Sequence, residues 1–421
     1  MNRIFYFLFV LFLSSAGWSQ NAWKQVADFP GDGRSSSSTF SFSDYGFIGL
    51  GYDGDEFNRS FYAYDPVYNS WNAVSSMGGI AGGGLDRNVA AAFTIGNKGY
   101  VGTGQGTAAF LNDFWEYNYQ TDVWTPKSSF AGTARRSAIG FSVNGKGYIG
   151  MGQDASGYKK DLWEYDTTSN TWTQKADFGG TARRLAIVFT IGNKAYAGTG
   201  DDGAFTNDFW MYDPSTNSWF MRDDFPGSPR YGATGFALNG KGYLACGYDT
   251  TLANRTDFWE YDAITDTWTE LEDFPGGRRA NAVAFTVDTL AFFGMGYDTS
   301  FYFDVWLWGD TTTIIPEDTT HDTTNAVEDL IVNKKTISIY PNPVNHFATL
   351  TVDNENINTE NIRLFDINGN DVTSKSTFRL RTAGLKHSEF QMEINGLPEG
   401  NYFVRINNGL IYATGKFMIF E

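Results

Sequence analysis

Apolar and aromatic residues occur along most of the chain in short runs, which polar and glycine-rich segments separate. Between residues 137 and 177 four such runs follow one another: "SAIGFSV", "KGYIGMG", "DLWEYD" and "TWTQKAD". Runs of this length and composition are typical of β-strands, and the Asn-Gly dipeptide after the first run indicates a tight hairpin. The segment therefore predicts four antiparallel strands joined by short turns.

The same pattern recurs along the chain. The Trp of each fourth run is separated from the next by 48, 53, 48, 47 and 49 residues, at Trp23, Trp71, Trp124, Trp172, Trp219 and Trp268. A fixed period in this range indicates a propeller or a solenoid, and four antiparallel strands per unit without helices are typical of a propeller blade.

The two ends of this region favour a closed ring. The last unit contains "NAVAFTV", "LAFFGMGYD" and "FDVWLWGD" but no fourth strand, whereas "NAWKQVADFP" near the N-terminus is a fourth strand without a unit. Pairing the two completes a blade and removes two open sheet edges. The sequence thus predicts an all-β protein with a six-bladed propeller that the N-terminal strand closes.

These residues resemble the kelch-repeat family of six-bladed propellers. A Gly-x-Gly follows the second run in five units, and the spacing from Tyr to Trp recurs, as in Tyr212 and Trp219. The resemblance implies the propeller fold for residues 20–310 and leaves function open, because function lies in loops on such scaffolds.

The first residues are typical of an export signal. Arg3 precedes an unbroken apolar run from Ile4 to Leu13, and Gly17 and Ser19 suit a cleavage before Gln20. We therefore expect residues 1–19 to be a signal peptide. The ten apolar residues of this run are too few to span a bilayer, and no other stretch is long and apolar enough to do so.

The last hundred residues differ from the repeats. Residues 311–335 are rich in Asp and Thr and predict a solvated linker. Strand-like runs resume in residues 336–421 and predict a small Ig-like β-sandwich. Four features in order, "YPNP", "LFDINGNDV", "LPEGNYFVRI" and "GKFMIF", resemble the C-terminal sorting domain of the type IX secretion system of Bacteroidetes. The resemblance implies the type IX machinery as a partner and a secreted or cell-surface location; a plain sandwich without a sorting role is the alternative.

Charge and composition narrow the classes of ligand. The net charge is −17, and removal of Arg3 with the signal peptide makes it −18, which argues against nucleic acid and anionic membranes. The predicted propeller has no histidine and one cysteine, Cys246, so His-based catalysis and His-ligated metals are excluded there. We expect no metal site and no cofactor; calcium stays an open alternative, because acidic loops such as "GTGDDG" could hold an oxygen-ligated ion.

Six arginines share one place in the repeat. Each lies six residues before the Phe of a first strand: Arg34, Arg87, Arg135, Arg183, Arg230 and Arg279. Their loops belong to one end of the propeller, so the six guanidinium groups could surround a ligand, since arginine suits carboxylates and sulfates. The alternative is structural, because third strands begin on the same side with Asp113, Asp161, Asp208, Asp257 and Asp304, or Ser60 in the first blade.

Asymmetry between the repeats gives a second set of candidate residues. After the second glycine, three units read Tyr-Asp, whereas the others have Gln or Asp: Tyr52 and Asp53, Tyr248 and Asp249, and Tyr297 and Asp298. Ring closure would make these blades neighbours. Aromatic faces beside carboxylates suit sugar rings, although the tyrosines could instead pack each loop against the next blade.

The sequence thus favours a secreted or surface-held propeller that acts as a binding scaffold for glycans or proteins. The alternative function is that of a metal-independent sugar-processing enzyme, a mutarotase, lyase or hydrolase, with Arg, Asp and Tyr on the rim. Some kelch propellers that open and close sugar rings make this alternative plausible by analogy. A catalytic carboxyl group would need a shielded pocket and a raised pKa.

Overall fold

A computed structural model describes residues 21–78 and 84–309, and in the tail 335–340, 347–352, 359, 362–366, 372–383, 388–394, 396–398, 400–407 and 412–419. The chain divides into two compact units. The first comprises Met1–Tyr117 and Trp124–Pro316, and the second comprises Asn118–Val123 and Glu317–Glu421. The predicted signal peptide at 1–19 and nearly all of the predicted linker at 311–335 lie outside the described residues.

The described part of the first unit contains six four-stranded sheets, and each is built from consecutive hairpins except the last. From inner to outer strand, the first three blades are β2 (Ser38–Ser41), β3 (Gly46–Gly49), β4 (Phe61–Asp65) and β5 (Ser70–Val74); β7 (Ala91–Ile95), β8 (Lys98–Gly102), β10 (Phe114–Asn118) and β11 (Val123–Pro126); and β12 (Ile139–Val143), β13 (Lys146–Gly150), β16 (Leu162–Asp166) and β17 (Thr171–Lys175). The other three are β18 (Ile187–Ile191), β19 (Lys194–Asp201), β20 (Phe205–Asp213) and β21 (Ser218–Arg222); β23 (Thr234–Leu238), β24 (Lys241–Ala245), β26 (Phe258–Asp262) and β27 (Thr267–Glu270); and β28 (Val283–Val287), β29 (Leu290–Gly294), β30 (Val305–Gly309) and β1 (Ala22–Gln25).

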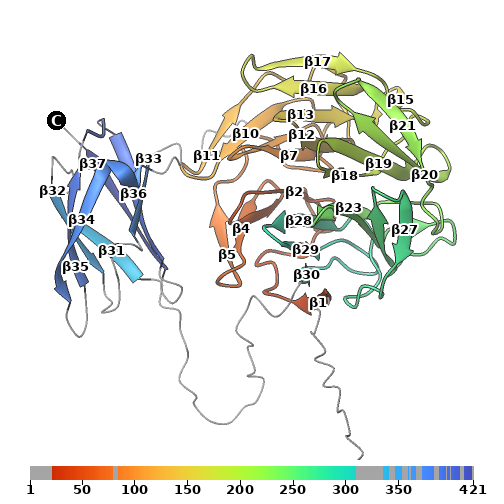
Figure 1. Cartoon of the computed structure of the whole chain (residues 1–421). Helices are drawn as coiled ribbons and strands as arrows, with labels where there is room; N and C mark the ends of the chain where they lie inside the picture. The colour runs from red at the N-terminus through yellow and green to blue at the C-terminus, as the bar shows by residue number, and fades with distance from the viewer. Residues whose placement is uncertain are drawn as a thin grey trace, which may run out of the picture. The chain divides into compact units, whose positions relative to one another are not determined.

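The N-terminal strand closes the ring, as the sequence predicted. β1 pairs antiparallel with β30, with Ala22 opposite Gly309 and Gln25 opposite Trp306. Each inner strand contacts the inner strands of the two neighbouring blades, and β28 contacts β2. Figure 1 shows the six inner strands near the centre of the propeller. The last blade therefore joins the two ends of the ring by backbone hydrogen bonds.

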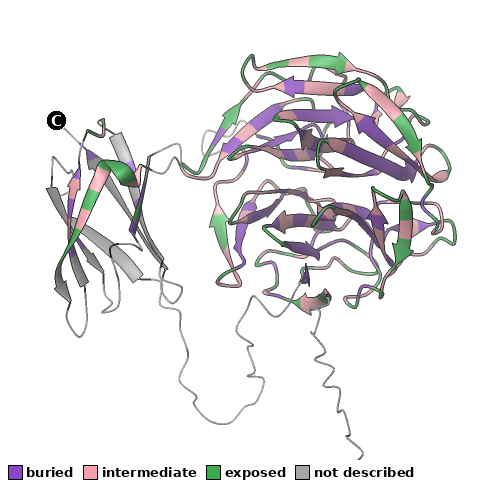
Figure 2. Ribbon diagram, viewed as in Figure 1, coloured by how far each residue is buried: buried purple, intermediate pink, exposed green. Residues whose placement is uncertain are grey.

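Aromatic side chains fill the space between blades. Tyr212 is buried on β20, lies opposite Trp219 of β21, and donates its hydroxyl to Asn217 in the intervening turn. Asn217 Oδ1 also accepts the N–H of Ala176 from the preceding blade, which anchors the two blades to each other. Inner strands are largely buried and outer strands are exposed (Figure 2). The repeated Tyr and Trp are thus packing residues between blades.

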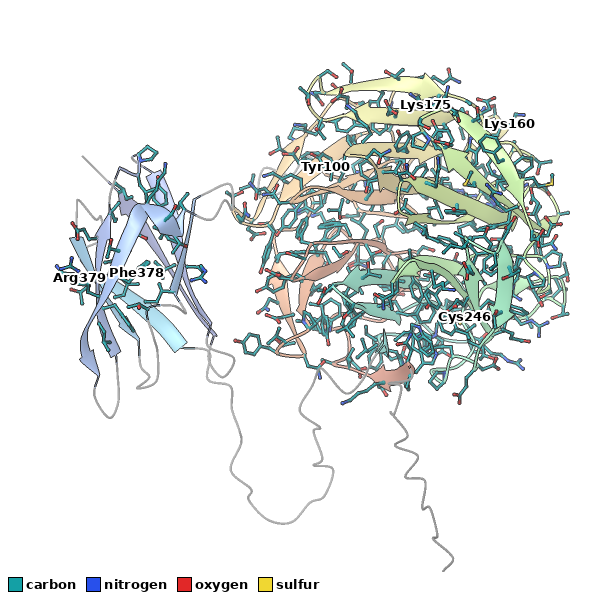
Figure 3. All side chains as sticks on the ribbon, viewed as in Figure 1. Tyr100, Lys160, Lys175, Cys246, Phe378 and Arg379 are labelled. Atoms are coloured by element: carbon teal, nitrogen blue, oxygen red, sulfur yellow. The ribbon has the colours of Figure 1, made fainter. Side chains whose placement is uncertain are left out.

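Cys246 lies in the hydrophobic core between the fifth and the last blade. Its side chain is buried among the side chains of the propeller (Figure 3), and burial raises the pKa of its thiol far above the usual value. A thiol held in the protonated form is a poor nucleophile, so Cys246 acts as a small apolar residue.

The second unit is also built from strands. They are β31 (Lys335–Tyr340), β32 (Phe347–Val352), β33 (Ile362–Asp366), β34 (Ser376–Ala383), β35 (Ser388–Ile394), β36 (Gly400–Asn407) and β37 (Tyr412–Ile419), with one 3-10 turn, η2 (Thr373–Lys375). β31 pairs with β37 through its first residues and with β32 through its last. One core contains both Phe390 and Met392 of β35 and Leu364 and Val404 of β33 and β36, an arrangement that suits two packed sheets. The Ig-like label for this unit stays a prediction.

Candidate functional site

The six repeated arginines are buried. Their exposed fractions are 3% or less, although arginine side chains are rarely fully buried without a partner. Five of them form ion pairs with an Asp of the same blade that lies directly before the third strand or, for Asp208, within it: Arg87 with Asp113, Arg135 with Asp161, Arg183 with Asp208, Arg230 with Asp257 and Arg279 with Asp304. These pairs join the loop before strand one to strand three, which is what the structural alternative predicts.

Arg135 shows the geometry that most blades repeat. Its Nη2 donates to Asp161 Oδ2 at 2.8 Å, its Nη1 to the carbonyl of Met151 at 3.0 Å, and its Nε to the carbonyl of Thr133 at 3.0 Å. The guanidinium also lies 4.9 Å from the ring centre of Phe130. A buried charge with this many partners is stable in place, since each donor replaces a lost contact with water.

The Gly-x-Gly motif supplies the backbone carbonyl that accepts a hydrogen bond from the buried arginine. Its central residue has a left-handed conformation in all six blades, for example Met151 at φ 57° and Thr103 at φ 60°, and also Cys246 at φ 62° in the fifth blade, where Ala245 replaces the first glycine. In this conformation the carbonyl accepts a guanidinium N–H, at 2.9 Å between Arg87 Nη1 and Thr103 O. The two motifs singled out in the sequence are therefore two halves of one structural unit.

The first blade departs from the pattern. Arg34 donates to Ser60 Oγ at 3.1 Å and to Leu50 O at 3.3 Å instead of to a carboxylate. Burial lowers the pKa of Arg34, and Asp53 and Asp32 only partly counter it. Arg34 is as deeply buried as its counterparts, so this departure does not expose the group.

Two residues after each arginine, the backbone forms a hydrogen-bonded ring around the axis. Each of these residues has a left-handed φ between 47° and 62° and donates its N–H to the carbonyl of the corresponding residue in the preceding blade: Ser36, Val89, Ser137, Leu185, Gly232 and Asn281. The N–H of Ser36 donates to Asn281 at 2.9 Å, which closes the cycle. We call these six residues the axial ring.

The residue between each buried arginine and the axial ring forms a β-bridge to the residue that follows Gly-x-Gly. Each blade thus presents two neighbouring side chains at the same end of the propeller. We call these twelve residues the mouth pairs: Ser35 with Tyr52, Asn88 with Gln105, Arg136 with Gln153, Arg184 with Asp201, Tyr231 with Tyr248 and Ala280 with Tyr297. The residue types of the mouth pairs differ from blade to blade, whereas the arginine one residue earlier is the same in all six blades.

Tyrosines occupy the mouth pairs of blades five, six and one. Tyr297 is 41% exposed, and Tyr52, Tyr231 and Tyr248 are partly exposed. Each also contacts an aromatic ring, with centres 5.4 Å apart for Tyr231 and Tyr248 and 5.7 Å for Tyr52 and Phe301 of the neighbouring blade. The tyrosines therefore pack the loops, as the alternative interpretation predicted, and still present part of their surface to solvent.

Arginines occupy the mouth pairs of blades three and four. Arg184 Nη2 lies 2.9 Å from Asp201 Oδ2, and the same oxygen accepts the hydroxyl of Tyr158 at 3.1 Å. Arg136 donates from Nη2 to Gln153 Oε1 at 3.1 Å, and its guanidinium lies 5.2 Å from the ring centre of Phe110. Both guanidinium groups remain at the mouth instead of entering the blade.

The predicted aspartates mainly organise their own loops. Asp53 accepts the N–H groups of Asp55 and Glu56, and these bonds outweigh burial and lower its pKa. Asp249 is buried; burial alone would raise its pKa, but bonds from Ser228, Thr251 and Arg255 lower it. Asp298 accepts the side-chain amide of Asn254 at 2.9 Å. Each aspartate holds a turn beside the tyrosine that precedes it.

Arg136, Arg184 and Tyr231 were not among the residues singled out from the sequence. A signal for them exists, because the residue after each repeated arginine reads Ser, Asn, Arg, Arg, Tyr and Ala around the ring. The doubled arginines at 135–136 and 183–184 hide it, since both residues of each pair look equally basic. Only burial separates the buried arginine from the one at the mouth.

Chemically, the mouth offers cations, amides, phenols and aromatic faces. Wherever burial and hydrogen bonds move the pKa of a described aspartate, they lower it, which does not favour a carboxyl general acid. Within the described ranges, no group of three His, Cys, Asp or Glu side chains is placed to hold a metal ion.

Comparisons with known proteins agree with this architecture. Residues 86–224 match a kelch-repeats domain model described for KLHDC2, KLHL20 and DRC7, and residues 338–420 match the secretion system C-terminal sorting domain. The solved structure of YjhT is similar over 66% of this chain and 95% of its own length, with a TM-score of 0.58 and 18% sequence identity. No curated protein matches the chain.

The part of the chain that the structure describes has no helix with the length and hydropathy needed to cross a bilayer. The sorting domain indicates export by the type IX secretion system, as the sequence predicted. The chain therefore joins a kelch-repeat β-propeller to a type IX C-terminal sorting domain, which directs it to the cell surface or the surrounding medium.

Proposed function

We propose that the propeller is a binding module of this exported protein and that its mouth binds a saccharide. One observation carries the proposal: four tyrosines occupy the mouth pairs of three consecutive blades, where the other three blades have polar or charged residues. The residues that stabilise the blades repeat from blade to blade, whereas these tyrosines occur in only three of the six mouth pairs. A ligand could therefore recognise this part of the mouth specifically. The six buried arginines take no part in the proposed site.

The tyrosines have the two properties that sugar binding requires. Tyr248 and Tyr297 present part of their surface to solvent, and sugar rings stack on such surfaces through their C–H faces. The hydroxyls of Tyr231, Tyr248 and Tyr297 make no hydrogen bond to any residue that the structure describes. A phenol at a solvated rim can therefore donate to, and accept from, a sugar hydroxyl.

A glycan array with the mature full-length chain tests the proposal. We expect binding by the wild type and a loss of at least about tenfold in affinity, about 1.4 kcal/mol, for the double variant Tyr248→Ala/Tyr297→Ala. Phe220→Ala is the matched control, because Phe220 is an exposed aromatic residue on outer strand β21. Tryptophan fluorescence checks that the variants fold, since the tail has no Trp.

The possible outcomes separate the candidate ligands. Binding that both variants retain would move the site away from the tyrosines. No glycan binding by the wild type would contradict the proposal and favour a protein ligand at the same surface.

A further inference from the structure

The mouth pairs of blades three and four contain two arginines, Arg136 and Arg184, but only one carboxylate, that of Asp201. Arg184 forms an ion pair with Asp201, whereas Arg136 has no carboxylate within ion-pair distance in the described parts of the chain. Burial, and after it the neighbouring Arg184 guanidinium, lowers the pKa of Arg136. Two guanidinium groups therefore lie close together, and only one of them has a carboxylate partner, in a protein that is otherwise strongly acidic.

A neutral oxygen holds the two arginines together. Gln153 Oε1 accepts Arg136 Nε at 3.2 Å, Arg136 Nη2 at 3.1 Å and Arg184 Nη1 at 2.9 Å. Three donors exceed the two lone pairs of an amide oxygen. Arg136 Nη1 has only a 3.5 Å contact to Gln105 Oε1, at the limit of a hydrogen bond. An anionic oxygen would use these donors better than the amides do, because charge-assisted bonds are shorter and stronger.

The pair is accessible and pre-oriented. The side chain of Arg184 is 26% exposed and Arg136 is partly exposed. Each guanidinium lies against a loop aromatic ring, with Phe110 5.2 Å from Arg136 and Tyr158 5.5 Å from Arg184. These contacts restrict the two side chains before a ligand arrives, which lowers the entropy lost on binding.

The tyrosines lie beside this pair. The residue after Tyr231, Gly232, donates its N–H to the carbonyl of Leu185, the residue after Arg184, at 3.2 Å. Arg184 and Tyr231 thus occupy adjoining positions in blades four and five. A ligand with an anionic group next to a sugar ring can reach both without spanning the mouth.

We propose that Arg136 and Arg184 bind the anionic group, a carboxylate or a sulfate, of an acidic saccharide whose ring lies on Tyr231 and Tyr248. This inference rests on the proposed saccharide binding and specifies the class of sugar. Guanidinium groups recognise both anions through the same planar arrangement of N–H donors. Because the protein as a whole repels anions, recognition must come from these two residues and not from net charge.

Two matched pairs of probes test the inference on the mature full-length chain. They are an oligogalacturonate and its methyl ester, and a sulfated galactan oligosaccharide and its desulfated form. We expect the wild type to bind one of the two acidic probes at least tenfold more tightly than its neutral counterpart, and Arg136→Met to abolish that preference. The preference of the wild type should weaken with added salt.

Lys160→Gln is the control variant. Lys160 is exposed and lies at the periphery of the propeller (Figure 3), so its replacement removes one positive charge without touching the pair. If Lys160→Gln lowers the acidic preference as much as Arg136→Met does, binding follows net charge and the inference is wrong. The conservative variant Arg136→Lys should keep part of the preference, since it keeps the charge and loses the planar fork.

The outcomes for the inference and for the proposed function differ. Equal affinity for the acidic and neutral forms of both pairs, or a preference that Arg136→Met leaves intact, overturns the inference and leaves saccharide binding standing. Binding of an acidic peptide, with no saccharide bound on the probes or on the array, overturns both.

Discussion

Arg135 and Arg136 are neighbours in the sequence and have opposite situations in the structure. Arg135 is 1% exposed and bound to Asp161, whereas Arg136 lies at the mouth and has only amide acceptors among the described residues. The first occurs in every blade and the second position changes from blade to blade. In this propeller the repeated arginine stabilises its own blade, whereas the variable position one residue later supplies side chains that we propose to bind a ligand.

The sharpest test of this comparison is the same substitution at both positions. Arg135→Met leaves the carboxylate of Asp161 without its buried partner, so we expect the free energy of unfolding to fall by about 3–5 kcal/mol. Urea denaturation followed by tryptophan fluorescence measures it in the propeller alone, because the tail has no Trp. A loss below 1 kcal/mol would mean that the buried pairs do not stabilise the blades.

Blade one provides a smaller effect of the same kind. Arg34 donates to Ser60 and to a backbone carbonyl, so Arg34→Met leaves no carboxylate without an ion-pair partner. We expect a loss of about 1–3 kcal/mol, the cost of unsatisfied neutral groups, in the same denaturation experiment. A loss equal to that of Arg135→Met would show that the loss in the free energy of unfolding does not depend on leaving a carboxylate unpaired.

Acid should weaken the buried Arg–Asp pairs. Burial acts to raise the pKa of Asp161, but the bonds and charge of Arg135 and the bond from Trp163 outweigh it and lower the pKa in the folded state. A carboxyl group with a lowered folded pKa stabilises the fold above its unfolded pKa of about 3.9, and this stability is lost as the pH falls further. The urea midpoint should therefore drop between about pH 5 and pH 2.

A variant checks the origin of that pH dependence. Asp161→Asn should be less stable at neutral pH and should lose less on acidification than the wild type does. An unchanged slope against pH would assign the effect to other carboxyl groups.

The smallest effect on stability is expected at the mouth. Arg136→Met removes bonds to two amide oxygens and no ion pair of the described residues, so the free energy of unfolding should change by about 1 kcal/mol or less. The urea midpoint measures it beside that of Arg135→Met. A loss as large as that of Arg135→Met would remove the distinction between the two arginines and assign both to the structure.

The sequence by itself determined the fold to a large extent. The period of the Trp residues predicted six four-stranded blades, and the unpaired fourth strand at residues 21–30 predicted closure, because a repeat must bury the same faces in every copy. The four ordered motifs from Tyr340 onward identified the sorting domain. These features are local or periodic, so they can be read without coordinates.

Tertiary structure decided which repeated residues are available to a ligand. The sequence left two interpretations for the six arginines, since a guanidinium suits both an internal carboxylate and an external anion. Burial and the ion pair with the Asp about 26 residues later favour the structural one. The left-handed turn after each arginine brings the next residue to the mouth, and that placement depends on hydrogen bonds between blades. Such bonds join residues about 50 positions apart, as between Ser137 and Val89, which is why sequence alone did not single out Arg136.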